Sequence, residues 1–420
     1  MVRSALPGGA QLVTVPLPGR ASVALSLMIR VGSRYEAAHE AGISHFVEHM
    51  VFKGGRRFPT ARAVSEAIEG VGGVLNAATD REATVFWTRV PATALPLALS
   101  VLTDMVFQPA LDPAEVTKER QVVIEELRMY EDNPQDYAQI VFDEVMWPDH
   151  ALGRDVAGTE QTVRTFSAEL CREHMARHVR PESLVVSVAG ALDPEHVEGL
   201  VSAELGAWAA QPRPAQPGAP PATPPQGARL RVARRRVEQA TVLVGARATS
   251  YLDPDRFASD LLNVVLGEGM SSRLFLELRE RQGSVYDVHS YISRLRDSGA
   301  MAISLGCEPR RAAAALRAAL AELRKLSEEL VGEAELHKAR EYAKGRLLLS
   351  LESTSALCEY AGQQLLLTGA IMQPAEIIER LEAVTAEDVR AAAQRLLASG
   401  MRAAIVGPFT GQARFEAALG

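Results

Sequence analysis

The stretch GISHFVEHMVFKGG, residues 42–55, carries the strongest pattern in this sequence. Within it, His45 and His49 are four residues apart, and Glu48 lies between them. On a helix, such a pair lies about 40° apart around the axis, so both imidazoles can point at one ion. Glu48 lies within about 100° of both and can reach a water at that ion without ligating it. We therefore interpret this stretch as a helix that carries part of a metal site.

Zinc is the metal that this arrangement favours. A catalytic zinc site combines two imidazoles, a third protein ligand and an open water position. The metal lowers the pKa of the water toward neutrality, and the carboxylate of Glu48 can then remove a proton as general base. We predict one Zn²⁺ per chain, with His45 and His49 as two of its ligands. The alternative is a pair of helix-surface histidines beside a glutamate, with no metal.

The third ligand is expected on a helix at residues 112–131, DPAEVTKERQVVIEELRMYE. Glu119 and Glu126 are seven residues apart and lie within about 20° of each other, beside the apolar stripe of this helix. Burying two carboxylates there is costly unless a cation compensates them. We predict Glu126 as the ligand and Glu119 as its support, with Glu125 nearer the polar side. The alternative is that all three glutamates are solvated helix charges.

A segment rich in Pro, Ala and Gly, residues 211–227, divides the chain almost in half. Its composition is typical of a semi-extended linker. Each half shows a strand pattern, a turn and a helix, and later an apolar strand followed by a long helix. We predict an α+β protein with two homologous domains, at 1–210 and 228–420, each a mostly antiparallel β-sheet packed with α-helices. Because the second half has no HxxEH pattern, the metal site is expected in the first domain.

Composition and charge exclude several function classes. The 420 residues are 47% hydrophobic and 23% charged, which is enough to bury substantial cores. A formal net charge of −7 is unlike that of a nucleic-acid-binding protein. The N-terminus lacks the apolar stretch of a secretory signal, and no apolar run reaches membrane-spanning length. We expect a cytoplasmic protein that binds no membrane, and we expect its three cysteines to be buried and reduced.

Three stretches of the first half resemble the pitrilysin, or insulinase, family, which includes insulin-degrading enzyme and the mitochondrial processing peptidases. They are HFVEHMVFKG at 45–54, GGVLNAATDRE at 72–82 and ERQVVIEELRMYEDNP at 119–134. The family has an inverted H-x-x-E-H zinc motif. The resemblance implies a glutamate ligand about 76 residues after that motif, which falls on Glu126, and a second glutamate seven residues earlier, which falls on Glu119.

The second half contains one further match, SSRLFLELRERQGSVYDVHS at 271–290. It resembles the family's stretch with an arginine and a tyrosine seven residues apart, here Arg279 and Tyr286. The resemblance implies that both side chains reach the zinc site from the second domain and contact the substrate backbone and the carbonyl under attack. A guanidinium and a phenol are suitable donors to a developing oxyanion. Without the resemblance, Arg279 would be an ordinary surface residue and Tyr286 a packing residue.

The resemblance also implies how substrate binds. Family members hold a peptide as an added strand beside the edge that corresponds to 72–82, which gives sequence-tolerant recognition. Asn76 and Ala77 are the residues expected nearest the substrate. The alternative is a plain edge or core strand.

Short family members pair to build a closed, clamshell chamber, which implies unfolded peptides as substrates. This chain carries both the metal set and the Arg–Tyr pair, which favours an active homodimer. The expected function is a zinc metalloendopeptidase. The alternatives are a non-catalytic partner or scaffold subunit of a heteromeric peptidase, and a metal-binding protein without proteolysis.

Overall fold

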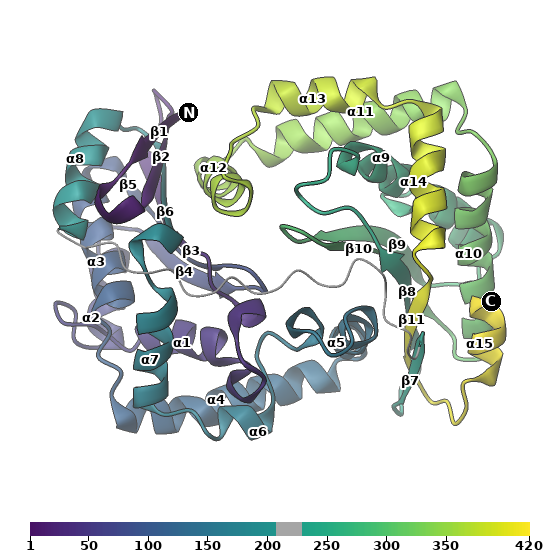
Figure 1. Cartoon of the computed structure of the whole chain (residues 1–420), viewed down its shortest axis with the longest axis horizontal. Helices are drawn as coiled ribbons and strands as arrows, with labels where there is room; N and C mark the ends of the chain where they lie inside the picture. The colour runs from purple at the N-terminus through teal and green to yellow at the C-terminus, as the bar shows by residue number, and fades with distance from the viewer. Residues whose placement is uncertain (207–228) are drawn as a thin grey trace. The chain divides into compact units, whose positions relative to one another are not determined.

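The computed structural model describes residues 1–206 and 229–420, so the predicted linker at 211–227 lies outside the described residues. The described chain forms two compact units, whose elements are labelled in Figure 1. The first unit contains Met1–Leu127, residues 155–206 and Leu349–Ile371. The second contains Arg128–Arg154, residues 229–348 and Met372–Gly420. Each half of the sequence therefore contributes one segment to the other unit. The boundaries 1–210 and 228–420 remain a prediction about the repeated halves.

The first unit is built on a six-stranded sheet with the strand order β1-β2-β6-β3-β5-β4. Only β2 and β6 pair in parallel, and the other neighbours are antiparallel. The prediction of a mostly antiparallel sheet is confirmed for this unit. The strands are β1 (Val2–Ala5), β2 (Gln11–Pro16), β3 (Ser22–Ile29), β4 (Val74–Thr79), β5 (Thr84–Pro91) and β6 (Leu184–Gly190).

The second unit repeats this topology in a five-stranded sheet with the order β7-β11-β8-β10-β9. Again one pair, β7 and β11, is parallel, and the other neighbours are antiparallel. The order matches β2-β6-β3-β5-β4 strand for strand, as the predicted duplication requires. The strands are β7 (Leu230–Arg234), β8 (Ala240–Arg247), β9 (Asp287–Arg294), β10 (Gly299–Cys307) and β11 (Arg402–Gly407).

Helices cover one face of the first sheet and close its larger core. Leu27 of β3 and Phe86 of β5 share this core with Phe46 and Met50, which belong to the predicted metal-site helix. The helices are α1 (Ile43–Val51), α2 (Ala61–Glu69), α3 (Leu95–Phe107), α4 (Pro113–Asp132), α6 (Glu160–Val163), α7 (Ala168–His178) and α8 (Pro194–Leu205). Because α1 lies on the sheet, its apolar side is fixed, and the side that carries the histidines is held in one orientation.

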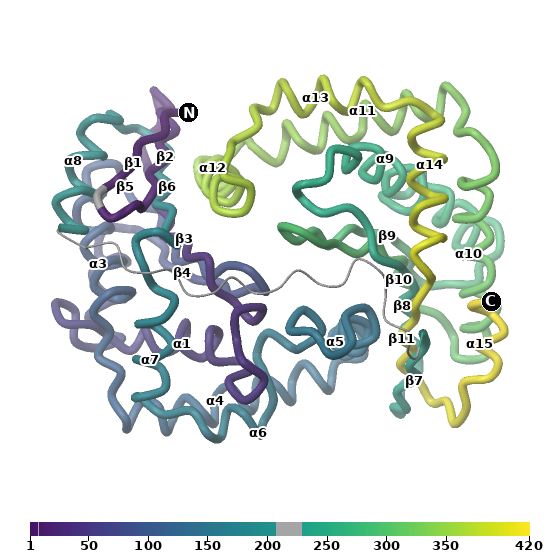
Figure 2. The backbone as a smooth tube through the Cα atoms, viewed as in Figure 1, coloured from purple at the N-terminus to yellow at the C-terminus, as the bar shows by residue number. Residues whose placement is uncertain are grey.

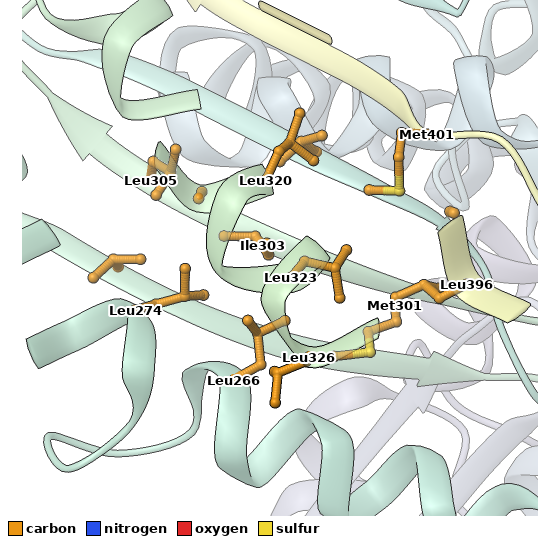
Figure 3. Close-up of a cluster of buried hydrophobic side chains, with 14 of the residues drawn as sticks. Leu266, Leu274, Met301, Ile303, Leu305, Leu320, Leu323, Leu326, Leu396 and Met401 are labelled. Carbon is orange, nitrogen blue, oxygen red and sulfur yellow. The ribbon is translucent and has the colours of Figure 1, made fainter. Parts of the chain in front are cut away.

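The second unit has an equivalent core between its sheet and its helices. Leu316, Leu320 and Leu323 follow helical spacing along α10 and are fully buried. Figure 3 shows leucines of α10 lying against Met301 and Ile303 of β10. The helices are α5 (Pro134–Met146), α9 (Arg256–Gly267), α10 (Ala312–Glu328), α11 (Glu333–Ser350), α13 (Pro374–Ala383), α14 (Ala386–Ala398) and α15 (Ala413–Leu419), with a π-helical turn at Phe275–Arg281.

The other face of the first sheet is covered by α12 (Thr354–Thr368), a helix from the second half of the sequence. It contacts β2, β3 and β6. In Figure 2 its yellow-green colour stands beside the purple of β2 and β3 and the teal of β6. Gly362 permits the close approach, because a Cβ there would lie 2.5 Å from Sδ of Met28 and 2.9 Å from Cβ of Ser187. The hydroxyl of Ser187 also donates a hydrogen bond to the carbonyl of Cys358 at 2.6 Å.

The second sheet receives α5 from the first half of the sequence in the same way. Val141 and Phe142 of α5 are buried with Leu243 of β8 and Ala404 of β11. The exchange of α5 and α12 ties each unit to both halves of the sequence. Cys171, Cys307 and Cys358 are buried and free, as expected. Within the described ranges, none of the helices combines the length and apolar character needed to cross a bilayer.

Candidate metal centre

A carboxylate fixes the N-terminus of α1. Glu36 is buried, and its side chain accepts hydrogen bonds from the backbone N–H of Gly42 at 2.7 Å and of Ser44 at 2.8 Å. A negative charge in this position satisfies free N–H groups and interacts favourably with the helix dipole. The start of the helix, at Ile43, is therefore held two residues before His45. Glu36 was not predicted, because nothing in its local sequence marks it as a cap.

The carboxylate of Glu126, on α4, lies close to both imidazoles of α1. Its Oε2 is 3.8 Å from Nε2 of His45 and 3.5 Å from Nε2 of His49. One potential ligand atom from each residue lies within 4.8 Å of the other two. All three side chains are partly buried, with 13% to 22% of their surfaces exposed. The structure thus brings together the three residues predicted as metal ligands.

These spacings are those of ligands around one ion. Zinc–nitrogen and zinc–oxygen bonds are about 2.0–2.2 Å long, so tetrahedral ligands lie roughly 3.3–3.6 Å apart. The distances from Glu126 to the two histidines are close to this spacing and are longer than a normal hydrogen bond. Two imidazoles and one carboxylate are also a donor set of catalytic zinc sites. The residues present therefore fit a zinc ion.

A second carboxylate holds the ring of His49 through its other nitrogen. Oε1 of Glu119 is 2.9 Å from Nδ1 of His49, and Oε2 is 2.5 Å from Nζ of Lys53. Burial alone would lower the pKa of His49, but the hydrogen bond with Glu119 and the charge of Glu126 outweigh it and raise the pKa. Burial would raise the pKa of Glu119, but its contacts with His49 and Lys53 lower it. Glu119 therefore has the contact expected of a supporting residue.

Burial keeps His45 neutral. Its pKa is lowered to about 4 by burial and by the neighbouring His49, while Glu126 opposes the shift. A neutral imidazole offers the lone pair that a metal needs. In the part of the chain that the structure describes, the buried Nδ1 of His45 has no hydrogen-bond partner. The ring of His45 is therefore oriented without the kind of contact that Glu119 gives to His49.

The predicted general base, Glu48, is oriented from β4. The hydroxyl of Thr79 donates a hydrogen bond to Oε2 of Glu48 at 2.6 Å. Burial raises the pKa of Glu48, and the hydrogen bond from Thr79 opposes the shift. A carboxylate with a raised pKa is a better base near neutral pH. Thr79 and Lys53 were not predicted, although both lie in stretches that carry the family resemblance. Their contacts depend on packing that local spacing does not encode.

The adjacent residues Glu125 and Glu126 lie on different sides of α4. Glu119 is buried and Glu126 is partly buried, whereas Glu125 is exposed. Val116 and Val123 are buried on the same side as Glu119. The prediction from helical spacing that Glu125 lies on the more polar side is confirmed.

Arg279 and Tyr286 belong to the second unit. Arg279 is exposed on the π-helical turn, with its guanidinium 5.0 Å from the ring centre of Phe275. Tyr286 directly precedes β9, and 57% of its surface is exposed. Such exposure does not fit a tyrosine that only packs in a core. The approach of both residues to the predicted metal ligands stays a prediction.

Asn76 and Ala77 lie on β4, the last strand of the first sheet. Asn76 is exposed, and its Oδ1 accepts a hydrogen bond from the N–H of Ala77 at 2.8 Å. Thr79, which contacts Glu48, ends the same strand. The edge of β4 therefore leads directly to the predicted general base. Contact of Asn76 and Ala77 with substrate stays a prediction.

Two buried histidines of α7 lie behind α1. The ring centres of His174 and His178 are 4.7 Å apart, and Nε2 of His174 is 3.2 Å from Oγ of Ser44. Burial lowers the pKa of His178 to about 4, with Arg177 adding to the shift. Burial also lowers the pKa of His174 well below its usual value. Both rings are therefore neutral in the folded chain at neutral pH.

These histidines predict a loss of stability in mild acid. In the unfolded chain they titrate near 6.5, so between that pH and about 4 the unfolded state binds more protons than the folded state. Between pH 7 and pH 5, His178 alone should lower the free energy of unfolding by about 2 kcal/mol. Urea unfolding at the two pH values measures this. His178→Gln should reduce the pH dependence, whereas His39→Gln, at an exposed position, should not. Equal pH dependence in all three proteins would contradict the assignment.

Comparison with known proteins gives the family. The model of the insulinase family, peptidase family M16, matches residues 12–160, and the model of the peptidase M16 inactive domain matches residues 165–342. An uncharacterized zinc protease of Streptomyces coelicolor is 37% identical over 410 residues, covering 97% of this chain and 89% of that protein. The uncharacterized zinc protease YmxG of Bacillus subtilis is 33% identical over 401 residues, covering 95% and 96%.

Solved structures share the fold. A protease from Helicobacter pylori matches with a TM-score of 0.90 at 24% identity, over 97% of this chain and 99% of that one. A peptidase M16 inactive domain from Pseudomonas fluorescens also gives a TM-score of 0.90, at 18% identity and 98% coverage of both chains. Two family models that span most of the sequence, and relatives that align over nearly all of it, establish that the chain belongs to the insulinase family, peptidase family M16.

Proposed function

We propose that this chain is a zinc metalloendopeptidase that hydrolyses unfolded peptides or short polypeptides. The observation that carries the proposal is the grouping of His45, His49 and Glu126 near the partly buried carboxylate of Glu48. The relatives are named uncharacterized zinc proteases, and these names support the proposal. One zinc ion per chain would be held by the three grouped residues.

Glu48 is assigned the proton transfers. A bound zinc ion would supply the Lewis acidity that polarises a carbonyl and makes a water acidic near neutral pH. Glu48 accepts a proton from the attacking water and later delivers it to the departing amine. The hydrogen bond from Thr79 limits rotation of its carboxylate. Its raised pKa makes it a stronger base for the first of these transfers.

We assign to Arg279 and Tyr286 the stabilisation of the negative charge that develops on the carbonyl oxygen. Both side chains are exposed and carry strong hydrogen-bond donors. Donors aimed at a developing oxyanion lower the barrier, and removing one such donor typically costs about a hundredfold or more in rate. The assignment rests on the match of this stretch to the family.

We assign to the edge of β4 the binding of the substrate backbone, with Asn76 and Ala77 nearest the peptide. β4 contains neither proline nor charge, so nothing in it opposes pairing with another strand. A cleft of about 480 Å³ lies between the β4–β5 face and α12, with Val74 and Trp87 on one wall and Glu359 on the other. Its size is in the range of ligand-binding pockets, and side chains of a peptide paired with β4 could enter it.

We further propose that two copies of the chain pair to form a closed chamber. One polypeptide contains the metal set and the Arg–Tyr pair, so a homodimer needs no second kind of subunit. A closed chamber admits unfolded peptides and excludes folded proteins. A non-catalytic subunit would have no use for Glu48 and its supporting Thr79.

The first test is hydrolysis of a mixed pool of unfolded peptides by the full chain. We expect cleavage that stops after a chelator removes the metal and returns on addition of Zn²⁺. A stable folded protein in the same reaction should stay intact, and the same protein should be cut once it is unfolded. Peptide cleavage that persists without metal would overturn the zinc mechanism. Efficient digestion of the folded protein would overturn the restriction to unfolded substrates.

A further inference from the structure

Lys53 has a contact that the proposed mechanism does not use. Its Nζ is 2.5 Å from Oε2 of Glu119, and Oε1 of the same carboxylate is 2.9 Å from Nδ1 of His49. Only 6% of the Glu119 side chain is exposed, against 26% for Lys53. The three side chains therefore form one chain of contacts. It runs from the cation, through both carboxylate oxygens, to a predicted metal ligand.

The backbone holds Lys53 in one place. The residue follows the last turn of α1, and its N–H donates a hydrogen bond to the carbonyl of Met50 at 3.1 Å. The next residue, Gly54, has φ +120°, and a Cβ there would lie 2.5 Å from the carbonyl carbon of Pro59. The carbonyl of Gly54 also accepts a hydrogen bond from Ala110 at 2.9 Å. Backbone conformation and packing thus hold the turn at Lys53 and Gly54 in place. They thereby fix the position from which the Lys53 side chain extends.

The cation decides how Glu119 is oriented. With both oxygens bonded, the carboxylate cannot rotate, and Oε1 stays at Nδ1 of His49. Without Lys53, Oε2 would be a buried oxygen that has lost its charged partner, which is costly. The side chain would then be expected to move toward water and to withdraw Oε1 from His49. Outer partners of metal-bound histidines fix the ring orientation in this manner.

We propose that Lys53 is a positioning residue of the metal centre. By holding Oε2 of Glu119 it keeps Oε1 on Nδ1 of His49, and so keeps Nε2 of His49 directed toward Glu126 and the metal. The proposal rests on the zinc site of the proposed function. It adds the residue that keeps the contact between Glu119 and His49 in place. Lys53 acts through its contact with Glu119, so its effect should appear in metal affinity.

The test is the zinc affinity of the full chain, measured by competition with a chromophoric chelator. Lys53→Met should weaken zinc binding about 10- to 100-fold, the effect typical of removing an outer contact of a metal ligand. Lys53→Arg, which restores a cation, should recover most of this loss. Lys118→Met is the matched control, because Lys118 is adjacent to Glu119 on α4 but is 69% exposed and pairs with Glu115. It should change the affinity by less than about twofold.

The same Lys53 substitution made in a Glu119→Gln chain separates a positioning role from general destabilisation. In the Glu119→Gln chain, Lys53→Met should change zinc affinity by less than about threefold, because the contact it supports has already been altered. Thermal unfolding of the metal-free proteins is measured alongside, since a purely structural lysine would change that unfolding and not the zinc affinity. Equal affinity of Lys53→Met and the parent chain would overturn the proposal, as would the same loss in both backgrounds. Zinc binding with the expected differences but no peptide hydrolysis would support the positioning role and sink the peptidase proposal.

Discussion

Replacing Glu48 with glutamine is expected to reduce peptide turnover by about a thousandfold or more while zinc stays bound. General acid–base catalysis contributes about 10²–10⁴-fold, and Glu48 is assigned both proton transfers. Glutamine keeps the size of the side chain and can still accept the hydrogen bond from Thr79. It cannot accept a proton from the attacking water. The predicted ligands His45, His49 and Glu126 are unchanged, so the metal content should stay near one per chain.

The measurement is kcat and KM on one peptide, with zinc content determined on the same samples. We expect the loss in kcat, because the interaction is made in the transition state and not in substrate binding. Glu69→Gln, an exposed glutamate of α2, is the matched control and should leave both constants unchanged. Turnover by Glu48→Gln at the parent rate would remove Glu48 from the mechanism. A loss of zinc in the same variant would reassign it as a ligand.

Replacing Glu126 with glutamine is expected to weaken zinc binding by at least about a hundredfold, and activity should fall with it. The variant loses the one anionic group among the three predicted ligands, so the effect should exceed the 10–100-fold loss typical of outer contacts. Oε2 of Glu126 lies close to both imidazoles, so no other residue of α4 occupies its place between them.

The adjacent glutamate provides the control. Glu125 differs from Glu126 by one residue, which on a helix is a rotation of about 100°. Its side chain is exposed, and Glu125→Gln should keep parental zinc affinity. The same change of charge at neighbouring positions thus separates ligation from a general electrostatic effect. A larger loss for Glu125→Gln than for Glu126→Gln would move the ligand by one residue.

Helical periodicity makes these residues predictable from the sequence. His45 and His49 are four apart, and Glu119 and Glu126 are seven apart, so each pair shares a helix face whatever the rest of the chain does. The same geometry separates Glu126 from Glu125. The order of strand and helix patterns in the two halves likewise predicts the repeated α+β fold, because sheet and helix patterns depend on local residue spacing.

Other contacts of the site could not be predicted in this way. Thr79 reaches Glu48 only because β4 lies beside α1, and Lys53 reaches Glu119 only because α4 passes the end of α1. Glu36 caps α1 through a side chain that belongs to the preceding loop. These partners are 6 to 66 residues apart in sequence, and no local period relates them.

The exchange of α5 and α12 is the largest difference from the predicted division of the chain. Each helix buries one face, which includes Val141 and Phe142 of α5 and Ala361 and Leu365 of α12. Local residue spacing does not say which sheet covers that face. Gly362 allows α12 to approach β3 and β6 closely, and this reason for a glycine is visible only in the folded chain.

By itself, the sequence determined the elements, their repetition and the helix faces that carry His45, His49 and Glu126, because these follow from residue spacing along one chain segment. Only the tertiary structure decided that the two helices meet, that Thr79 and Lys53 complete the site, and that each sheet is covered by a helix from the other half. Those outcomes depend on packing between segments distant in sequence, where shape, burial and charge pairing select one arrangement among many.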